Sequence, residues 1–239
     1  MMKMRAVVLL CVLQILFCSC AVDNGINGAE NGYRITEVTF TDYDDTISQY
    51  IEIVYPQLKG LESEAIEQIV NEEVRRTAFE VLRWFSSFDN MEIEVSNTIT
   101  YASADVFSVH FVTKSFHSVQ AYPLVCSLST TLSLETGEKI KLSDIVNLNS
   151  EFIDSFFDKF QLDSEFYSTE IGHSIEEDIK AKISHELLLK ADNGSYSEVC
   201  SFLTEDSLVI SFEVRYAVGS YALYKANYSD IAESLKLLS

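Results

Sequence analysis

The cysteines are the residues of this chain with the clearest capacity for covalent chemistry. Cys18 and Cys20 stand in the stretch FCSC at residues 17–20, which ends an apolar run and precedes a polar one. A cysteine thiol can be acylated, oxidised to a disulfide or held by a metal ion. Which of these reactions applies depends on the compartment in which the chain folds.

The N-terminal residues predict export. Lys3 and Arg5 lie within the first five residues, and residues 6–17 are apolar except for Gln14. A membrane-spanning helix needs about 20 apolar residues, so this shorter run with small residues at its end is typical of a cleaved secretory leader. The ending also resembles a bacterial lipobox. We therefore expect residues 1–19 to be removed and Cys20 to be lipidated; an ordinary cleaved leader with incidental cysteines is the alternative.

The segment that follows, residues 20–33, contains repeated Asn-Gly turns and few apolar residues, as a flexible tether does. Beyond it, Cys126 and Cys200 remain, 74 residues apart. In an oxidising compartment we expect them to form a disulfide, which in the chain-entropy model contributes about 4 kcal/mol. The alternative is two separately buried thiols. The expected location is the membrane surface, facing the periplasm or the cell exterior.

Other chemistry-bearing residues give weak patterns. The sequence has no GxSxG, HExxH, GxxxxGK[ST] or GxGxxG motif. Its four histidines lack metal-ligand spacing and are interpreted as surface residues: His110, His117, His173 and His185. We therefore expect no catalytic residues, no metal site and no cofactor.

The stretch TDYDD contains Asp42, Asp44 and Asp45. It lacks the Gly and the closing Glu of a calcium-binding loop. A solvated acidic turn is the preferred interpretation, and these three carboxylates are kept as candidate contacts for a cationic partner.

Charge narrows the choice of partner. Without the leader the chain keeps 15 basic and 37 acidic residues, a net charge of −22. Such a field repels nucleic acid and anionic lipid and attracts cationic proteins. Nucleic-acid binding is therefore excluded, and contact with the membrane is expected through the lipid anchor alone. A simpler interpretation is that the acidic surface only keeps an exported protein soluble.

The apolar pattern predicts strands, then a long helix, then strands again. Alternation indicates strands at residues 34–40, 50–55, 91–95, 106–112 and 124–134. A helix is expected from a cap at Ser63 to Phe85. In 124–134 one face is apolar and the other carries Ser and Thr, which indicates a sheet with one solvated face. A hairpin turn at residues 135–138 leads into a return strand over 139–142.

The second half is expected to contain helices over 150–160 and 174–190, strands over 196–203 and 208–214, and a short helix after Ser229. Because strands and helices do not alternate regularly, the fold class is α+β, with antiparallel sheets packed against a long helix and two to three further helices. One domain is expected over residues 34–239, with halves at 34–125 and 126–239.

Several stretches in order resemble a known family. They are IEIVYPQLKGLESEAIEQIVNEEV, FSVHFVTKSF, AYP, LSLETGEKIKLSDIV and LTEDSLVISFEVRYAVGSYA. Together they are similar to the extracytoplasmic module of RsiV-like, lysozyme-sensing anti-sigma factors, which also occurs in some peptidoglycan deacetylases. The resemblance implies an α+β module that binds lysozyme at the cell surface. The sigma-binding segment and the deacetylase catalytic domain of those proteins have no counterpart in this sequence.

The expected function is binding rather than catalysis. The partner class is a cationic protein such as lysozyme, or a cell-wall component. Candidate contacts besides the TDYDD acids are four C-terminal tyrosines, a residue type favoured at interfaces: Tyr216, Tyr221, Tyr224 and Tyr228. These tyrosines could instead pack an amphipathic edge strand. Alternative functions are an envelope hydrolase acting on peptidoglycan and a structural or assembly lipoprotein.

Overall fold

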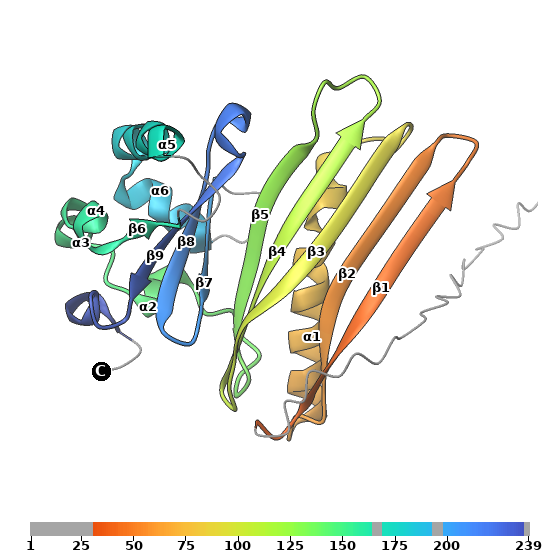
Figure 1. Cartoon of the computed structure of the whole chain (residues 1–239). Coiled ribbons are helices and arrows are strands. Elements are labelled where there is room, and N and C mark those ends of the chain that lie inside the picture. Colours follow the sequence, from red (N-terminus) through yellow and green to blue (C-terminus); the bar gives the residue numbers. More distant parts are fainter. Residues whose placement is uncertain (1–30, 164–168, 193–197, 237–239) are drawn as a thin grey trace, which may run out of the picture.

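The computed structural model describes residues 31–163, 169–192 and 198–236. The expected leader, Cys20 and most of the tether lie outside these residues. The described chain forms two sheets that lie beside each other (Figure 1). Within the described residues, no helix is long and apolar enough to cross a membrane.

The large sheet has five strands in the order β1-β2-β3-β4-β5. Their bounds are Arg34–Asp44, Gln49–Lys59, Met91–Ala102, Val106–His117 and Leu124–Ser133. All neighbouring strands are antiparallel except β2 and β3, which pair in parallel over Tyr50–Ile53 and Glu92–Val95. Helix α1, Glu64–Ala78, lies between these two strands in the chain, and a parallel pair requires such a crossover.

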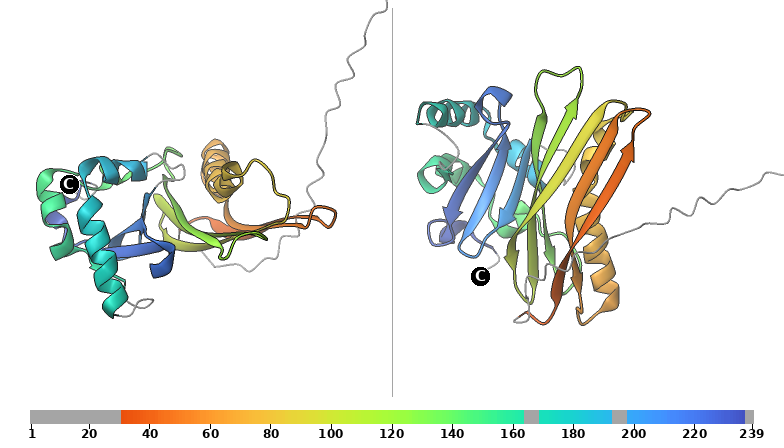
Figure 2. Two further views of the ribbon diagram at one scale, coloured as in Figure 1. Left: turned by 90° about the horizontal axis from the view of Figure 1, so that it is seen from above. Right: turned by 45° about the vertical axis from the view of Figure 1, so that its right-hand side comes forward.

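Helix α1, Glu64–Ala78, covers one face of the large sheet (Figure 2). Its N-cap is Ser63, whose side chain accepts a hydrogen bond from the Ile66 amide, as the sequence predicts. The helix ends seven residues before Phe85 and continues as a 3₁₀ turn over Glu80–Trp84. Buried side chains of α1 and of the sheet, such as Val74, Ile53 and Phe111, form one hydrophobic core.

The small sheet has the order β6-β9-β8-β7, with every pair antiparallel. Its strands are Gln161–Leu162, Tyr221–Asn227, Ser207–Glu213 and Val199–Leu203, respectively. The short helices of this half are α2 Leu142–Ile145, α3 Ser150–Asp154, α4 Phe156–Lys159 and α6 His185–Leu189, and the longer one is α5 Thr169–Lys182. The expected helices over 150–160 and 174–190 are thus each divided in two.

Three expectations concern the boundary between the sheets: the hairpin turn, the return strand after it and the division of the domain into halves. Gly137 adopts φ +75° in the turn after β5, as expected for a hairpin turn. The return strand over 139–142 is reduced to one isolated bridge between Leu132 and Lys139. β5 itself crosses the expected division at 125/126, so the large sheet extends to Ser133.

The polar face of β4 and β5 differs from its expected solvated state. Strand β7 packs over part of this face, where Ser129 Oγ donates to the Ser201 carbonyl at 2.7 Å. The Leu203 amide donates to Ser108 Oγ at 3.2 Å, and that hydroxyl also contacts the Thr131 hydroxyl at 2.8 Å. This part of the sheet face carries small hydroxyl side chains. It can be buried because these hydroxyls have hydrogen-bond partners. The rest of the face, over β2, β3 and the distal half of β4, stays open.

Candidate functional site

The open face of the large sheet carries two rows of side chains, fixed by strand register. Tyr50 of β2 lies beside Glu92 of β3, and Glu92 pairs with Phe116 of β4. One pair further along, the row is Glu52, Glu94, Lys114 and Val125. Because side chains alternate across a strand and Ile51 and Ile93 face α1, these rows point away from the helix. We call the acidic members, Glu52, Glu92 and Glu94, the acidic rows.

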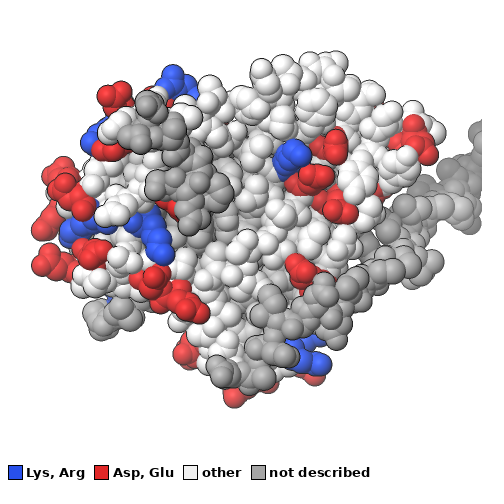
Figure 3. All heavy atoms as spheres, viewed as in Figure 1, with Lys and Arg blue, Asp and Glu red and all other residues white. Residues whose placement is uncertain are grey.

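The acidic rows border a hollow on the surface. Its volume is about 320 Å³, and its lining comprises Glu92, Glu94, Lys114, Phe116 and Pro123. Figure 3 shows acidic side chains gathered around one basic side chain on this face. Lys114 Nζ lies 3.5 Å from Glu94 Oε2, with both side chains about half exposed, so this pair contributes little to stability.

The electrostatic effect of the acidic rows is visible at Tyr50. Its hydroxyl donates to Glu52 Oε2 at 3.0 Å, and this hydrogen bond raises the pKa of Tyr50. The charges of Glu94 and Glu92 add to the rise. A negative potential at this face would favour a cationic group placed over it.

A groove adjoins the hollow at Pro123, a residue that lines both. The groove has a volume of about 440 Å³ and lies between the β4–β5 loop and the turn between β8 and β9. Tyr122 and Tyr216 stack across it, with ring centroids 4.8 Å apart and planes at 28°. Both tyrosines remain well exposed, at 63% and 48%. The two sheets thus each contribute one aromatic ring to the same surface.

The turn that carries Tyr216 is held in place by its neighbours. Gly219 and Ser220 both have positive φ, +119° and +71°, which reverses the chain between β8 and β9. Arg215 Nε pairs with Asp178 Oδ2 of α5 at 2.9 Å. Tyr216 is therefore presented by a turn anchored to α5 rather than by a free loop.

The other three candidate tyrosines lie away from this groove. Tyr224 is only 1% exposed and packs against Phe156 and Phe212 in the core of the small sheet. Tyr221 is half-buried, and its ring meets His110 edge-on. The sequence predicts the four tyrosines as one set of contacts, but the fold brings Tyr216 alone to the groove. Tyr221 and Tyr224 lie in β9, as the alternative of an amphipathic strand predicts.

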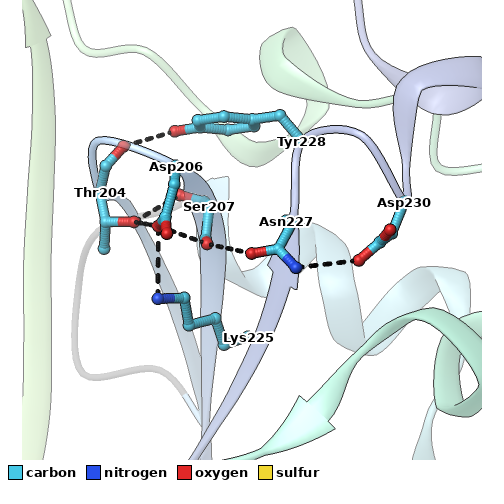
Figure 4. Close-up of polar contacts among 7 residues, drawn as sticks. All are labelled: Thr204, Asp206, Ser207, Lys225, Asn227, Tyr228 and Asp230. Atoms are coloured by element: carbon cyan, nitrogen blue, oxygen red, sulfur yellow. Dashed lines mark hydrogen bonds and ion pairs between the residues drawn. The ribbon is translucent and has the colours of Figure 1, made fainter.

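Tyr228 belongs to a polar cluster at the turn between β7 and β8 (Figure 4). Its hydroxyl donates to the Thr204 carbonyl at 2.8 Å. Beside it, Asp206 accepts from Ser207 Oγ at 2.7 Å and Thr204 Oγ1 at 3.0 Å and pairs with Lys225 at 3.3 Å. These contacts, led by Ser207, lower the pKa of Asp206 to about 2. The cluster closes a turn, and each of its polar groups is used within the chain.

The TDYDD carboxylates have a similar local role. Asp44 Oδ1 accepts from the Thr46 amide at 2.9 Å and from the Thr46 hydroxyl at 2.6 Å, and these bonds lower the pKa of Asp44. Asp42 accepts from Gln49 Nε2 at 2.8 Å, and Asp45 accepts from Tyr43. The three acids shape the β1–β2 hairpin, on the opposite edge of the sheet from β5, where the groove lies.

A possible nucleophile and base meet in the seam between the sheets. His110, buried rather than at the surface, contacts Ser127 Oγ through Nε2 at 2.8 Å, and Ser127 Oγ lies 3.3 Å from Cys200 Sγ. The His110 ring also stacks on Phe202. Burial lowers the pKa of His110 to about 4, so the imidazole is neutral at pH 7.

Serine bonded to neutral histidine is a geometry used in nucleophilic catalysis. The cavity beside Ser127 and Cys200, however, holds about 10 Å³, roughly one water molecule. Ser127 is only partly buried, but this cavity is too small to hold a substrate. In the described arrangement, His110 and Ser127 stabilise the contact between the sheets.

The expected disulfide is absent from this structure: Cys126 and Cys200 are free, buried thiols. They belong to different faces of the fold, because Cys126 shares the α1 side of β5 with Leu128 whereas Cys200 faces Ser127 on the other side. Burial raises the pKa of Cys126 to about 12 and also raises that of Cys200. Protonated thiols are poor nucleophiles and poor metal ligands. The alternative of two buried thiols therefore describes them.

Sequence reasoning missed two parts of the open surface. Tyr122, in the AYP stretch, is not among the predicted contacts, and the glutamates of 91–95 are predicted only as the polar positions of a strand. The alternation of residues 91–95 already indicates that Glu92 and Glu94 point to the same face of a strand. Among the described residues, no group of three or more His, Cys, Asp or Glu side chains is arranged to hold a metal ion.

The comparisons with known proteins define the fold. No protein-family model matches the sequence, and no curated protein matches it significantly. A solved structure of a DUF3298 family member from Bacteroides fragilis is similar at a TM-score of 0.51 and 11% identity, with 85% of this chain and 93% of that chain covered. A DUF3298 family protein from Pseudomonas aeruginosa reaches a TM-score of 0.49 at 10% identity over 84% of this chain and 94% of its own. The chain therefore has an α+β fold similar to that of a DUF3298 protein, an uncharacterised domain.

Proposed function

We propose that this chain is an exported, lipid-anchored binding module of the cell envelope whose partner is a cationic protein of the lysozyme type. Recognition works through the acidic rows and the adjoining aromatic groove. The observation that carries the proposal is the open face of the large sheet, where Glu52, Glu92 and Glu94 project together beside exposed aromatic rings.

The charge of the chain supports this class of partner. A net charge of −22 after the leader steers cationic proteins toward the surface over distances comparable to the Debye length, about 8–10 Å in physiological salt. The acidic rows then supply a local target, and Phe116 offers a ring face on which a Lys or Arg side chain can lie. The resemblance to RsiV-like modules points to the same class of partner.

The closed seam favours binding over catalysis. An envelope hydrolase would need room for its substrate beside the nucleophile, and the cavity beside Ser127 holds only about 10 Å³, while His110 is buried. Incubation with peptidoglycan fragments followed by mass spectrometry distinguishes the two functions. A binding module leaves the fragments intact, and new cleavage products would support the hydrolase instead.

The direct test is the affinity for a lysozyme of high isoelectric point at low ionic strength. We expect binding by the unaltered chain and about a tenfold weaker affinity for the Glu92→Gln/Glu94→Gln variant, since two rim charges are lost. The matched control, Glu62→Gln/Glu135→Gln, removes two exposed charges elsewhere and should bind like the unaltered chain. Absence of binding at low salt would reject lysozyme-like partners and leave a wall component or a purely structural role.

A further inference from the structure

Besides its aromatic rings and its charge, the groove includes part of the outer edge of β5, which is the edge that faces away from β4. Strand β5 is the last strand in the order β1-β2-β3-β4-β5. It pairs with β4 along one edge, and no other strand of this sheet pairs with its outer edge. Its outer edge is occupied at Ser133, whose amide donates to the Glu138 carbonyl, and at two further residues. The Thr131 carbonyl accepts from the Ile140 amide, and the Ser127 carbonyl accepts from Cys200 Sγ at 3.6 Å.

The backbone of Val125 also belongs to this outer edge, as the alternating direction of backbone groups along β5 shows. Within a strand, the amide and carbonyl of one residue point to the same side, and those of the next residue point to the opposite side. Because Thr131 and Ser127 direct their carbonyls outward, the amide and carbonyl of Val125 also point outward. Val125 lines the groove together with Tyr122 and Tyr216. The groove thus brings a strand edge and an aromatic pair into one space.

We propose that the groove binds a short extended peptide segment of the cationic partner, which pairs with the edge of β5 at Val125 as an added strand. This deepens the proposed function and rests on it, because it names the chemical form in which the partner is recognised. A volume of about 440 Å³ falls in the usual range for ligand pockets, about 300–1,000 Å³.

Charge and shape select the occupant. In strand addition, backbone hydrogen bonds supply affinity, and alternate side chains are read by the surfaces on either side. Glu213 lines the groove, whereas the acidic rows lie two strands further along the sheet, beyond Val125 and Lys114. A basic side chain of the segment would therefore meet the Glu213 carboxylate, while the exposed Tyr122 ring covers an apolar side chain. An extended segment with alternating basic and β-branched residues fits this surface.

The test uses the full chain in detergent and a synthetic peptide, acetyl-VRVRVT-amide. Two analogues of this peptide are N-methylated on alternate amides, one at odd positions and one at even positions. Only one alternate set can face β5, and the arginines fix the register since a slip by one residue reverses every side chain. We expect one analogue to bind about tenfold more weakly and the other to bind like the parent peptide.

Protein variants provide the second readout. Val125→Pro removes the outward amide hydrogen, a change that an edge strand tolerates, and Val125→Thr keeps it with a side chain of similar size. We expect Val125→Pro to weaken peptide binding about tenfold and Val125→Thr to leave it unchanged. If Val125→Pro does not fold, the two N-methylated peptides alone decide the question.

The outcomes separate the two proposals. Lysozyme binding together with equal affinities of the two N-methylated peptides would overturn strand addition and leave the cationic partner intact. Loss of both lysozyme and peptide binding would overturn the proposed function itself. Discrimination between the two analogues supports the added strand.

Discussion

The two sheets of this protein use their faces differently. In β3 of the large sheet, buried residues alternate with more exposed ones from Met91 to Val95. In β8 of the small sheet, six consecutive residues, Ser207 to Phe212, are buried. The small sheet is covered on both sides, by helices and by the large sheet, whereas the large sheet is covered by α1 on one side and only over β4 and β5 by β7 on the other.

This difference assigns separate roles to the two sheets. The small sheet contributes mainly stability, with an aromatic core around Phe156. The large sheet leaves one face open over β2 and β3, where we propose that a partner binds. Because one face of this sheet is left to solvent over β2 and β3, acidic side chains are held there at a fixed spacing. Changes in the small sheet or in the seam should therefore alter the free energy of unfolding, and changes on the open face should alter binding.

The largest effect is expected in the aromatic core. Phe156 is fully buried and stacks on Phe160 with centroids 4.4 Å apart. Phe156→Ala should lower the free energy of unfolding by about 3–5 kcal/mol because it removes buried area and leaves a cavity. Urea unfolding measures this loss. The control is Phe157→Ala at a partly buried neighbour, and equal losses for both variants would contradict the assigned core.

The second effect is a pH dependence that arises in the seam. The pKa of His110 is about 4 in the folded chain, below its ordinary value of 6.5, because burial disfavours the charged form. The unfolded chain therefore takes up the proton first, and stability falls as the pH decreases from about 6.5 toward 4. The full effect is about 3 kcal/mol.

Unfolding measured across this pH range tests the assignment. The His110→Phe variant keeps an aromatic ring beside Phe202 and removes the titration. Its stability should vary less between pH 6.5 and 4 than that of the unaltered chain. An unchanged pH slope in the variant would show that another group is responsible.

A smaller loss is expected for the hydroxyl groups of the seam. Ser108→Ala leaves the Leu203 amide and the Thr131 hydroxyl without their partner, and unsatisfied buried groups cost about 1–3 kcal/mol. The matched change, Ser96→Ala at an exposed position of β3, should be nearly neutral. Equal stabilities of the two variants in urea would mean that β7 does not seal this face.

The smallest effect is expected at the β7–β8 turn. Asp206 is exposed, and its contacts with Ser207, Thr204 and Lys225 lower its pKa to about 2. Their stabilising contribution is present above the unfolded pKa of 3.8 and is lost as the pH falls toward 2. Asp206→Asn should thus lower the melting temperature slightly at neutral pH. A difference from the unaltered chain that persists undiminished at pH 2 would contradict this origin.

Much of the fold could be predicted from local patterns. Ser63 caps α1, the alternation of residues 91–95 and 106–112 marks β3 and β4, and Gly137 supplies the positive φ of a turn. These features depend on residues close together in the chain. Strand β9, Tyr221–Asn227, corresponds to the alternative in which the C-terminal tyrosines pack an amphipathic strand rather than to the preferred set of contacts.

The candidate site depended on distant contacts and was harder to predict. The Ser and Thr positions of β5 have the pattern of a solvated face, yet Cys200 to Leu203 cover them from 70 or more residues away. Likewise, Tyr216 becomes part of the candidate site only because the fold brings Tyr122, from the loop between β4 and β5, against its ring. A periodic pattern tells which side a residue faces but not what packs on that side.

The central claim is that the open acidic face binds a cationic protein, and two neighbouring substitutions of opposite charge test it most directly. Affinity for a lysozyme of high isoelectric point is measured for Glu94→Gln and for Lys114→Met, which alter the two members of one exposed ion pair. If the partner's charge is read at this face, Glu94→Gln weakens binding and Lys114→Met strengthens it. Equal changes in the same direction, or no change in either variant, would contradict the account.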